Sequence, residues 1–114
     1  MAISFDSIGT VCATFQAATP LPVGSVCKMA SNGYLSECAA GDGFLGRVET
    51  ADGDLHAVTV RGFVTLKYSG ALPSYGVCKL SADGSGGVKV DSEKGLPFHV
   101  VQLDTVNHTV TVLL

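Results

Sequence analysis

Two histidines are the first residues of this sequence whose type and placement could support chemistry. His56 and His108 each precede a Val-Thr-Val segment, and two imidazoles brought together by symmetry could bind a metal ion or exchange protons. A third ligand would have to come from Asp54, Asp104 or His99, and no spacing requires one. The simpler interpretation is that each histidine starts a strand on that strand's polar face.

Two cysteine–lysine pairs are the second candidates, because Cys27-Lys28 and Cys78-Lys79 share the context Val-Cys-Lys. A nucleophilic cysteine needs a neighbouring base and a lowered pKa. Adjacent residues of a strand point to opposite faces, so neither lysine can activate the cysteine beside it. We therefore expect both cysteines to be small core residues.

The four cysteines, at positions 12, 27, 38 and 78, include no Cys-x-x-Cys pair and no histidine-rich partner segment. This pattern disfavours a zinc site. It favours four reduced thiols that pack as small apolar residues. A disulfide such as Cys12–Cys27 is the alternative.

Two acidic, glycine-containing segments could bind ions but have simpler interpretations. Asp52-Gly53-Asp54, with Glu49 before it, lacks the rest of an EF-hand loop, so it predicts a turn. The segment at residues 83–87 precedes an expected strand and lacks the Lys-Ser/Thr of a phosphate loop, so it predicts a mobile hairpin tip. We expect no metal, no cofactor and no enzymatic activity.

Composition restricts the remaining classes. Apolar residues make up 46% of the 114, charged residues 15%, and there are 14 glycines, a combination typical of short strands joined by tight turns. The net charge is −3 and the basic residues are scattered, which disfavours a nucleic-acid partner. No apolar run is long enough to span a bilayer, and the first residues lack a secretory signal pattern. We therefore expect folding in a cytoplasm and no membrane partner.

The chain repeats itself. Residues 22–33 return as residues 73–84 at an offset of 51, and the segment that begins at His56 returns at His108 with an offset of 52. We predict an all-β fold, a small barrel or tight sandwich, built from two repeats of about 50 residues with pseudo-two-fold symmetry. Residues 8–114 would form one domain, with repeats at about 8–60 and 61–114. The identical residues of the opening stretch are Pro22/Pro73, Val26/Val77, Cys27/Cys78, Lys28/Lys79 and Gly33/Gly84.

Alternating apolar and polar residues predict the strands. The change of apolar phase at Gly62 predicts a bend or bulge inside the longest of them. Asn32-Gly33 predicts a two-residue hairpin of type I′, which needs positive φ angles. The expected strands are 8–17, 23–29, 34–38, 44–50, 55–68, 77–80, 86–90, 98–103 and 105–114.

Residues 1–7 lie outside the repeat. Ile3 and Phe5 alternate with Ser4 and Asp6, as in a strand. The segment is either an edge strand of the domain or an extended arm that adds a strand to a partner.

These features together resemble the small capsid decoration proteins of tailed bacteriophages, also called cement or head-stabilising proteins, of the duplicated β-barrel type. The resemblance covers residues 8–114 and implies a non-enzymatic virion protein, made in the host cytoplasm, that binds the major capsid protein on the outer capsid surface. It also implies a homotrimer and attachment through an N-terminal arm, here Ile3, Ser4, Phe5 and Asp6. The segments that carry it are residues 24–29, 32–33, 44–48, 58–64, 75–80 and 110–114.

Two other function classes stay open. A ligand- or carbohydrate-binding β module of a phage tail or cell surface would need an aromatic platform, for which Tyr34, Tyr75 and Phe63 are the candidates. A small cysteine- or metal-dependent enzyme fits the sequence least.

Overall fold

A computed structural model describes residues 10–114 of the chain. The predicted arm, with Ile3, Ser4, Phe5 and Asp6, lies outside the described residues. Residues 10–114 contain ten strands and no helix, and hence no helix long and apolar enough to cross a membrane. The all-β prediction is confirmed.

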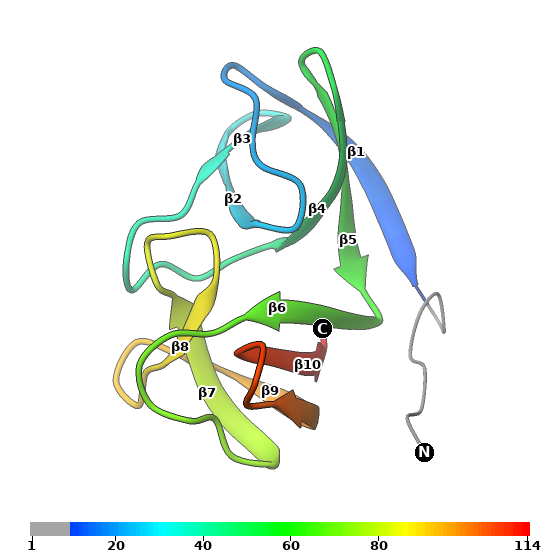
Figure 1. The fold of residues 1–114 in the computed structure, drawn as a ribbon. Helices are drawn as coiled ribbons and strands as arrows, with labels where there is room; N and C mark the ends of the chain where they lie inside the picture. Colours follow the sequence, from blue (N-terminus) through cyan, green and yellow to red (C-terminus); the bar gives the residue numbers. More distant parts are fainter. Residues whose placement is uncertain (1–9) are drawn as a thin grey trace.

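The first half of the chain forms a closed barrel of five strands in the order β1-β3-β2-β4-β5 (Figure 1). β1 pairs with β5 antiparallel and with β3 parallel, which closes the barrel. The strands are β1 (Val11–Ala17), β2 (Val26–Ser31), β3 (Tyr34–Glu37), β4 (Gly46–Asp52) and β5 (Leu55–Arg61).

The second half forms a separate five-stranded sheet in the order β6-β10-β9-β7-β8. Counted from the start of each half, the neighbours are the same as in the barrel. The contact that would close this sheet is a single parallel bridge, Tyr68 to Val88. The strands are β6 (Phe63–Lys67), β7 (Gly76–Ala82), β8 (Val88–Val90), β9 (Leu96–Asp104) and β10 (Thr109–Leu113).

Gly62 is the link between the two sheets. β5 ends at Arg61 and β6 begins at Phe63, while Gly62 is buried and has a φ of 108°. That backbone conformation is rarely open to a residue with a side chain. The predicted bend at Gly62 is therefore confirmed, and it carries the chain from one sheet into the other.

The hairpin at Asn32-Gly33 is also present, because Ser31 pairs with Tyr34. Gly33 has a φ of 74°, but the one described non-glycine residue with positive φ is His108. A type I′ turn needs positive φ at both central residues, so the predicted turn type is wrong. An irregularity in the β2–β3 ladder between Met29 and Ser31 accompanies this different turn.

Several strand predictions are displaced, among them the strand predicted at 23–29, which runs from Val26 to Ser31. The strand predicted at 44–50 runs from Gly46 to Asp52, since Phe44 packs inward from a loop. The turn of the final hairpin, predicted around residues 104–107, lies at residues 105–108, because β9 extends to Asp104 and β10 starts at Thr109. The side chain of Asp104 caps this turn by accepting bonds from the N–H groups of Val106 and Asn107.

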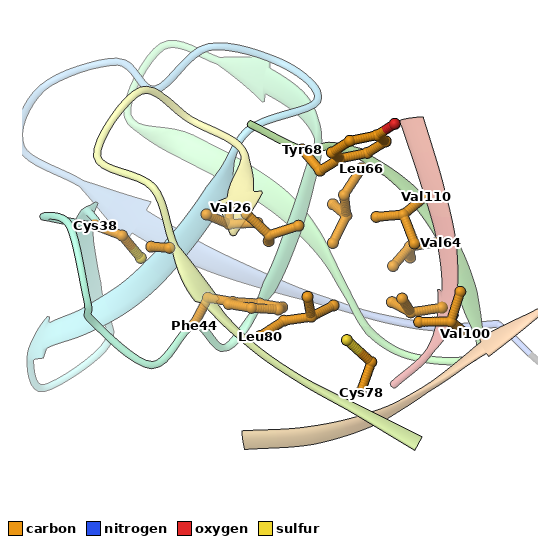
Figure 2. Close-up of a cluster of buried hydrophobic side chains, with 13 residues drawn as sticks. Val26, Cys38, Phe44, Val64, Leu66, Tyr68, Cys78, Leu80, Val100 and Val110 are labelled. Carbon is orange, nitrogen blue, oxygen red and sulfur yellow. The ribbon is translucent and has the colours of Figure 1, made fainter. Parts of the chain in front are cut away.

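Two hydrophobic clusters fill the molecule. The smaller one lies within the barrel and consists of Ala17, Leu21, Cys27, Leu35, Val48 and Val58. The larger one joins both halves, because Val26, Cys38 and Phe44 of the first half pack with the inner face of the second sheet (Figure 2). Phe44 also stacks on Phe98, with ring centroids 4.9 Å apart. The two sheets thus share one core.

Candidate functional site

The structure gives the two candidate histidines different environments. His56 is fully buried, and its Nε2 accepts a hydrogen bond of 3.0 Å from the backbone N–H of Leu21. The expectation that His56 lies on a polar face is wrong, because its ring supports the loop that precedes β2. A histidine committed in this way acts as a structural acceptor.

His108 is exposed and precedes β10 with a φ of 54°. Its ring meets Tyr68 edge-on, with centroids 5.6 Å apart. His99 is exposed on β9. The structure does not gather these residues into a site: residues 10–114 contain no group of three or more His, Cys, Asp or Glu side chains that could hold a metal ion.

The four cysteines are free thiols. Cys27, Cys38 and Cys78 are buried, as predicted for small core residues, whereas Cys12 is exposed, contrary to that prediction. Burial raises the pKa of Cys27 from 9.0 to about 12 and that of Cys38 from 9.0 to about 11. Because the thiolate is the nucleophile, these two thiols are poor candidates for catalysis.

Each lysine of the Val-Cys-Lys segments points away from its cysteine, as predicted. Lys28 Nζ donates to Asp42 Oδ2 at 2.6 Å, while Cys27 lies in the barrel core. The hydrogen bond from Lys28 holds the pKa of Asp42 below its usual value. Lys79, in contrast, is exposed and belongs to neither of the two ion pairs found among residues 10–114.

The carboxylates near the Asp52-Gly53-Asp54 turn do not converge on a common point where an ion could bind. Glu49 receives hydrogen bonds from Arg47 at 3.0 Å and from the Thr59 hydroxyl at 2.8 Å. Asp52 and Asp54 are exposed on either side of Gly53, whose φ is 62°. The segment is a hairpin turn, as predicted.

The glycine-rich tip at residues 83–87 is held at several points. Asp83 Oδ1 accepts the N–H groups of Ser85 and Gly87, and its Oδ2 accepts the hydroxyl of Ser69. The carbonyl of Gly86 accepts the N–H of Val26 at 3.0 Å, which attaches the tip to the barrel half. These bonds argue against the predicted mobile tip and make it a bridge between the sheets.

A groove of about 650 Å³ lies beside this bridge. One wall is β6 with its continuation, residues 65–69, and another is the tip itself. The facing wall comes from the barrel half, residues 22–25 and Arg47. Pockets of about 300–1,000 Å³ are typical of binding sites, so this groove is the main candidate site of the described residues.

Two cationic side chains line the groove from opposite walls. Arg47 projects from β4 and its Nη1 is paired with Glu49, while its Nε is buried and has no hydrogen-bond partner among residues 10–114. Lys67 is exposed on β6 and takes part in neither ion pair of residues 10–114. Asp83 is also present, but its carboxylate is already occupied by its own loop and Ser69. Because Arg47 is paired with Glu49, Lys67 is the groove cation left without an ion pair among residues 10–114. The available groups therefore favour an occupant that supplies hydrogen-bond acceptors, with an acidic group at Lys67.

A second surface feature lies on the outer face of the second sheet. Val77, His99, Leu113 and Phe63 are successive cross-strand partners along one row through β7, β9, β10 and β6. Val77 is 61% exposed, Leu113 41%, and the neighbouring Tyr75 68%. We call these five residues the outer apolar row. Exposed apolar groups that cluster in this way are typical of protein contact surfaces.

Sequence reasoning missed the groove. Its walls come from segments that are remote in sequence, and only the strand pairing brings residues 22–25, 65–69 and 83–87 together. The one usable signal was the glycine run at 83–87, where Gly87 lies against the Lys67 carbonyl so closely that a Cβ would fall 2.5 Å from it. The aromatic candidates also separate, since Tyr34 belongs to the barrel and Phe63 to the second sheet.

No protein-family model matches this chain, and no curated protein matches it significantly.

Proposed function

We propose that this protein is a non-enzymatic structural component of a tailed-phage virion that binds the outer surface of the capsid and stabilises the head. The observation that carries the proposal is the outer apolar row, which offers a second protein exposed apolar side chains at Tyr75, Val77 and Leu113. Partner burial of such side chains is the main favourable contribution to protein association.

The residues behind the resemblance to capsid decoration proteins support the same role. Residues 24–29 form the entry into β2, residues 44–48 lead into β4, and residues 58–64 carry the chain from β5 to β6. These segments build the scaffold, and the thiol of Cys27 within them is buried with a raised pKa. A scaffold of this kind suits a protein whose task is to hold neighbours together.

We also infer that the two halves arose by duplication and are related by pseudo-two-fold symmetry. The sequence repeat at an offset of 51 supports this inference, and so does the common strand order of the two sheets. In this proposal residues 8–114 act as one domain, held together by the shared core.

The protein would act as a homotrimer attached to the major capsid protein, with residues 1–7 as an arm. Individually weak contacts become strong when many copies are held on one lattice. Ile3 and Phe5, which alternate with Ser4 and Asp6, would supply the arm's apolar contacts. The proposed location is the outer surface of the virion.

The test is to mix the purified protein with expanded empty capsids of its own phage. Stoichiometric co-sedimentation and a higher capsid melting temperature are expected. A protein that neither binds nor stabilises the capsids would refute the proposal. Deletion of residues 1–7 should weaken binding while the far-ultraviolet circular dichroism of the β fold stays unchanged; equal affinity would remove the arm from the proposal.

The groove favours one alternative, a ligand- or carbohydrate-binding module, since its volume of about 650 Å³ suits a small ligand. Sugar-binding sites commonly stack rings on aromatic side chains, and the one aromatic residue that lines this groove is Tyr68, which is buried. A glycan array with micromolar, sequence-specific binding would support the alternative over capsid attachment.

A further inference from the structure

The edge of β6 that faces away from β10 borders the groove at Thr65 and Lys67. β6 pairs with β10 in an uninterrupted antiparallel ladder, and the bonds at its two ends are Tyr68 N–H to His108 C=O and Leu114 N–H to Gly62 C=O. Hydrogen-bonded pairs alternate with non-bonded pairs in such a ladder. The peptide groups of Val64 and Leu66 therefore face β10, and those of Thr65 and Lys67 face the opposite way.

Among residues 10–114, few backbone groups pair with the side of β6 that faces away from β10. The parallel bridge between Tyr68 and Val88 closes its C-terminal end, where Ser69 N–H donates to the carbonyl of Val88. No strand of residues 10–114 pairs with Thr65 on this side, since β6 has β10 as its one strand partner. The N–H and C=O of Thr65 and the N–H of Lys67 are thus presented to the groove.

In the barrel, the position that corresponds to the gap between β6 and β8 is closed by strand pairing. There β1 pairs with β3 in parallel through Gln16–Tyr34 and Ala17–Leu35. In the second sheet, β8 has only three residues and contacts the end of β6 through the single bridge between Val88 and Tyr68. The groove occupies the remaining space between β6 and the barrel residues 22–25.

The chemistry of the groove identifies the kind of occupant. A row of alternating N–H and C=O groups is complemented by the main chain of an extended segment, which is how a strand adds to an open sheet edge. Neighbouring strands lie about 4.8 Å apart, and the groove follows β6 over residues 65–69. Lys67, which is in neither ion pair of residues 10–114, adds a preference for an acidic residue. Arg47 is paired with Glu49, so its unpartnered Nε adds only a preference for an acceptor such as a carbonyl oxygen.

We propose that the edge of β6 at Thr65 and Lys67 receives one extended strand of the capsid subunit, which seats in the groove between Thr65 and Arg47 and places an acidic residue at Lys67. This inference rests on the proposed capsid attachment and names the contact that would carry it. It assigns the barrel and the second sheet different roles: the barrel loop at 22–25 forms the wall of the groove, and the second sheet supplies the edge.

The first test uses Thr65→Pro, which removes the outward N–H and leaves the inward ladder to β10 intact, since proline is tolerated at an edge position that faces solvent. Binding to expanded empty capsids is measured by co-sedimentation, with the fold checked by circular dichroism. Thr65→Pro should weaken binding by at least about tenfold, the effect of one lost hydrogen bond and a blocked approach.

Two variants control for side effects. Thr65→Val keeps the N–H and removes the hydroxyl, which is 2.9 Å from that of Thr111, and it should bind like the wild type. Thr105→Pro places a proline in the exposed turn between β9 and β10, and it should also bind normally. Lys67→Glu should weaken binding and reduce its sensitivity to salt.

Hydrogen–deuterium exchange separates the possible outcomes and does not depend on any variant folding. The amides of Thr65 and Lys67 should exchange rapidly in the free protein and become protected on capsids, while that of Leu66 is protected in both states. Protection of Thr65 in the free protein would mean that this chain or a second copy already fills the edge, which overturns the inference. Capsid binding without protection would overturn the inference and leave the proposed function standing, whereas absent capsid binding would overturn both.

Discussion

The barrel and the second sheet have the same strand order, yet residues that match in sequence occupy different places in the two ladders. The parallel contact of the first strand of each half with the third allows the two ladders to be aligned. Ala17 lies opposite Leu35 in the barrel, and Tyr68 lies opposite Val88 in the second sheet. Ala17 and Tyr68 are 51 residues apart, as the sequence repeat requires.

Across that contact the two halves diverge. Leu35 pairs with Met29, whereas Val88 pairs with Ala82. Ala82 therefore holds the same place in the second sheet as Met29 does in the barrel, and we call it the ladder counterpart of Met29. The residue that matches Met29 in the sequence repeat is Leu80, two positions earlier. A shift of two residues keeps a side chain on the same face of a strand and changes its depth along the strand. Met29 is 41% exposed, while Leu80 is fully buried.

The two histidines also match in sequence and differ in burial. Phe15 pairs with His56 in the barrel, and Leu66, the residue 51 positions after Phe15, pairs with Val110. The ladder counterpart of His56 is thus the buried Val110 and not the exposed His108. Matching letters in a repeat therefore identify a shared strand but do not determine burial. Ladder position accounts for the burial of His56 and Val110 but not for the exposure of Met29, since its ladder counterpart Ala82 is fully buried.

Substitutions at the Met29/Leu80 match should have the largest effect. Leu80→Ala removes a fully buried side chain from the larger core and should lower the free energy of unfolding by about 2–5 kcal/mol. Met29→Ala should change it by no more than about 0.5 kcal/mol. Urea denaturation measures both, and equal losses would contradict the difference in burial between these two matched residues.

The histidine match should give the next largest difference. His56→Ala leaves the Leu21 N–H without an acceptor inside the molecule and opens a cavity, so we expect a loss of about 2–4 kcal/mol. His108→Ala removes an exposed ring and its contact with Tyr68, at a cost of no more than about 1 kcal/mol. Thermal denaturation by calorimetry distinguishes them. A greater loss at His108 would contradict the assignment of His56 as the structural residue.

Alkaline pH should test the cysteine of the barrel core. The pKa of Cys27 is raised from 9.0 to about 12 by burial and, secondarily, by Cys38. The unfolded chain therefore releases this proton first, and the stability that Cys27 contributes is complete below pH 9 and declines from there toward pH 12. Cys27→Ala should lose less stability over that range than the wild type. The exposed Cys12→Ala is the control, and a wild-type-like decline in Cys27→Ala would contradict the prediction.

The smallest effect should come from the lysines of the repeat. The Lys28 hydrogen bond lowers the pKa of Asp42, so its contribution to stability is present above the carboxyl's usual pKa and is lost as pH falls through the lowered value. Lys28→Ala should raise the pKa of Asp42, followed by NMR titration, and move the acid-unfolding midpoint to higher pH. Lys79→Ala should do neither. If Lys28→Ala leaves the titration of Asp42 unchanged, the ion pair does not form in solution.

The strands were predictable because their signals are local. Alternation of apolar and polar residues marks β1, β5 and β10, and the phase change at Gly62 marks the passage between sheets. Turn positions were equally readable, although the type at Asn32-Gly33 was not, since tertiary contacts override a local preference of that size. The polar face assigned to His56 failed for the same reason: its acceptor role depends on Leu21, far away in sequence.

The candidate site was not predictable from local signals. Thr65 and Lys67 of β6 face the groove without a strand partner among residues 10–114 because β8 is short and meets Tyr68 at one bridge. Neither fact is visible before the strand order is known. The same holds for the outer apolar row, whose members Val77, Leu113 and Phe63 read as ordinary alternating strand residues. Which face of a sheet a partner covers is a property of the assembled fold.

The strand order has a consequence for the order in which the chain folds as it is synthesised. All five strands of the barrel lie before residue 62, so they are all available once Arg61 has been synthesised. The barrel can therefore close while the second half is still emerging from the ribosome. The second sheet has its last strand, β10, between β6 and β9, so it cannot form completely until translation ends. During that interval Val26, Cys38 and Phe44 lack their partners in the larger core, and a stalled or truncated chain would expose them.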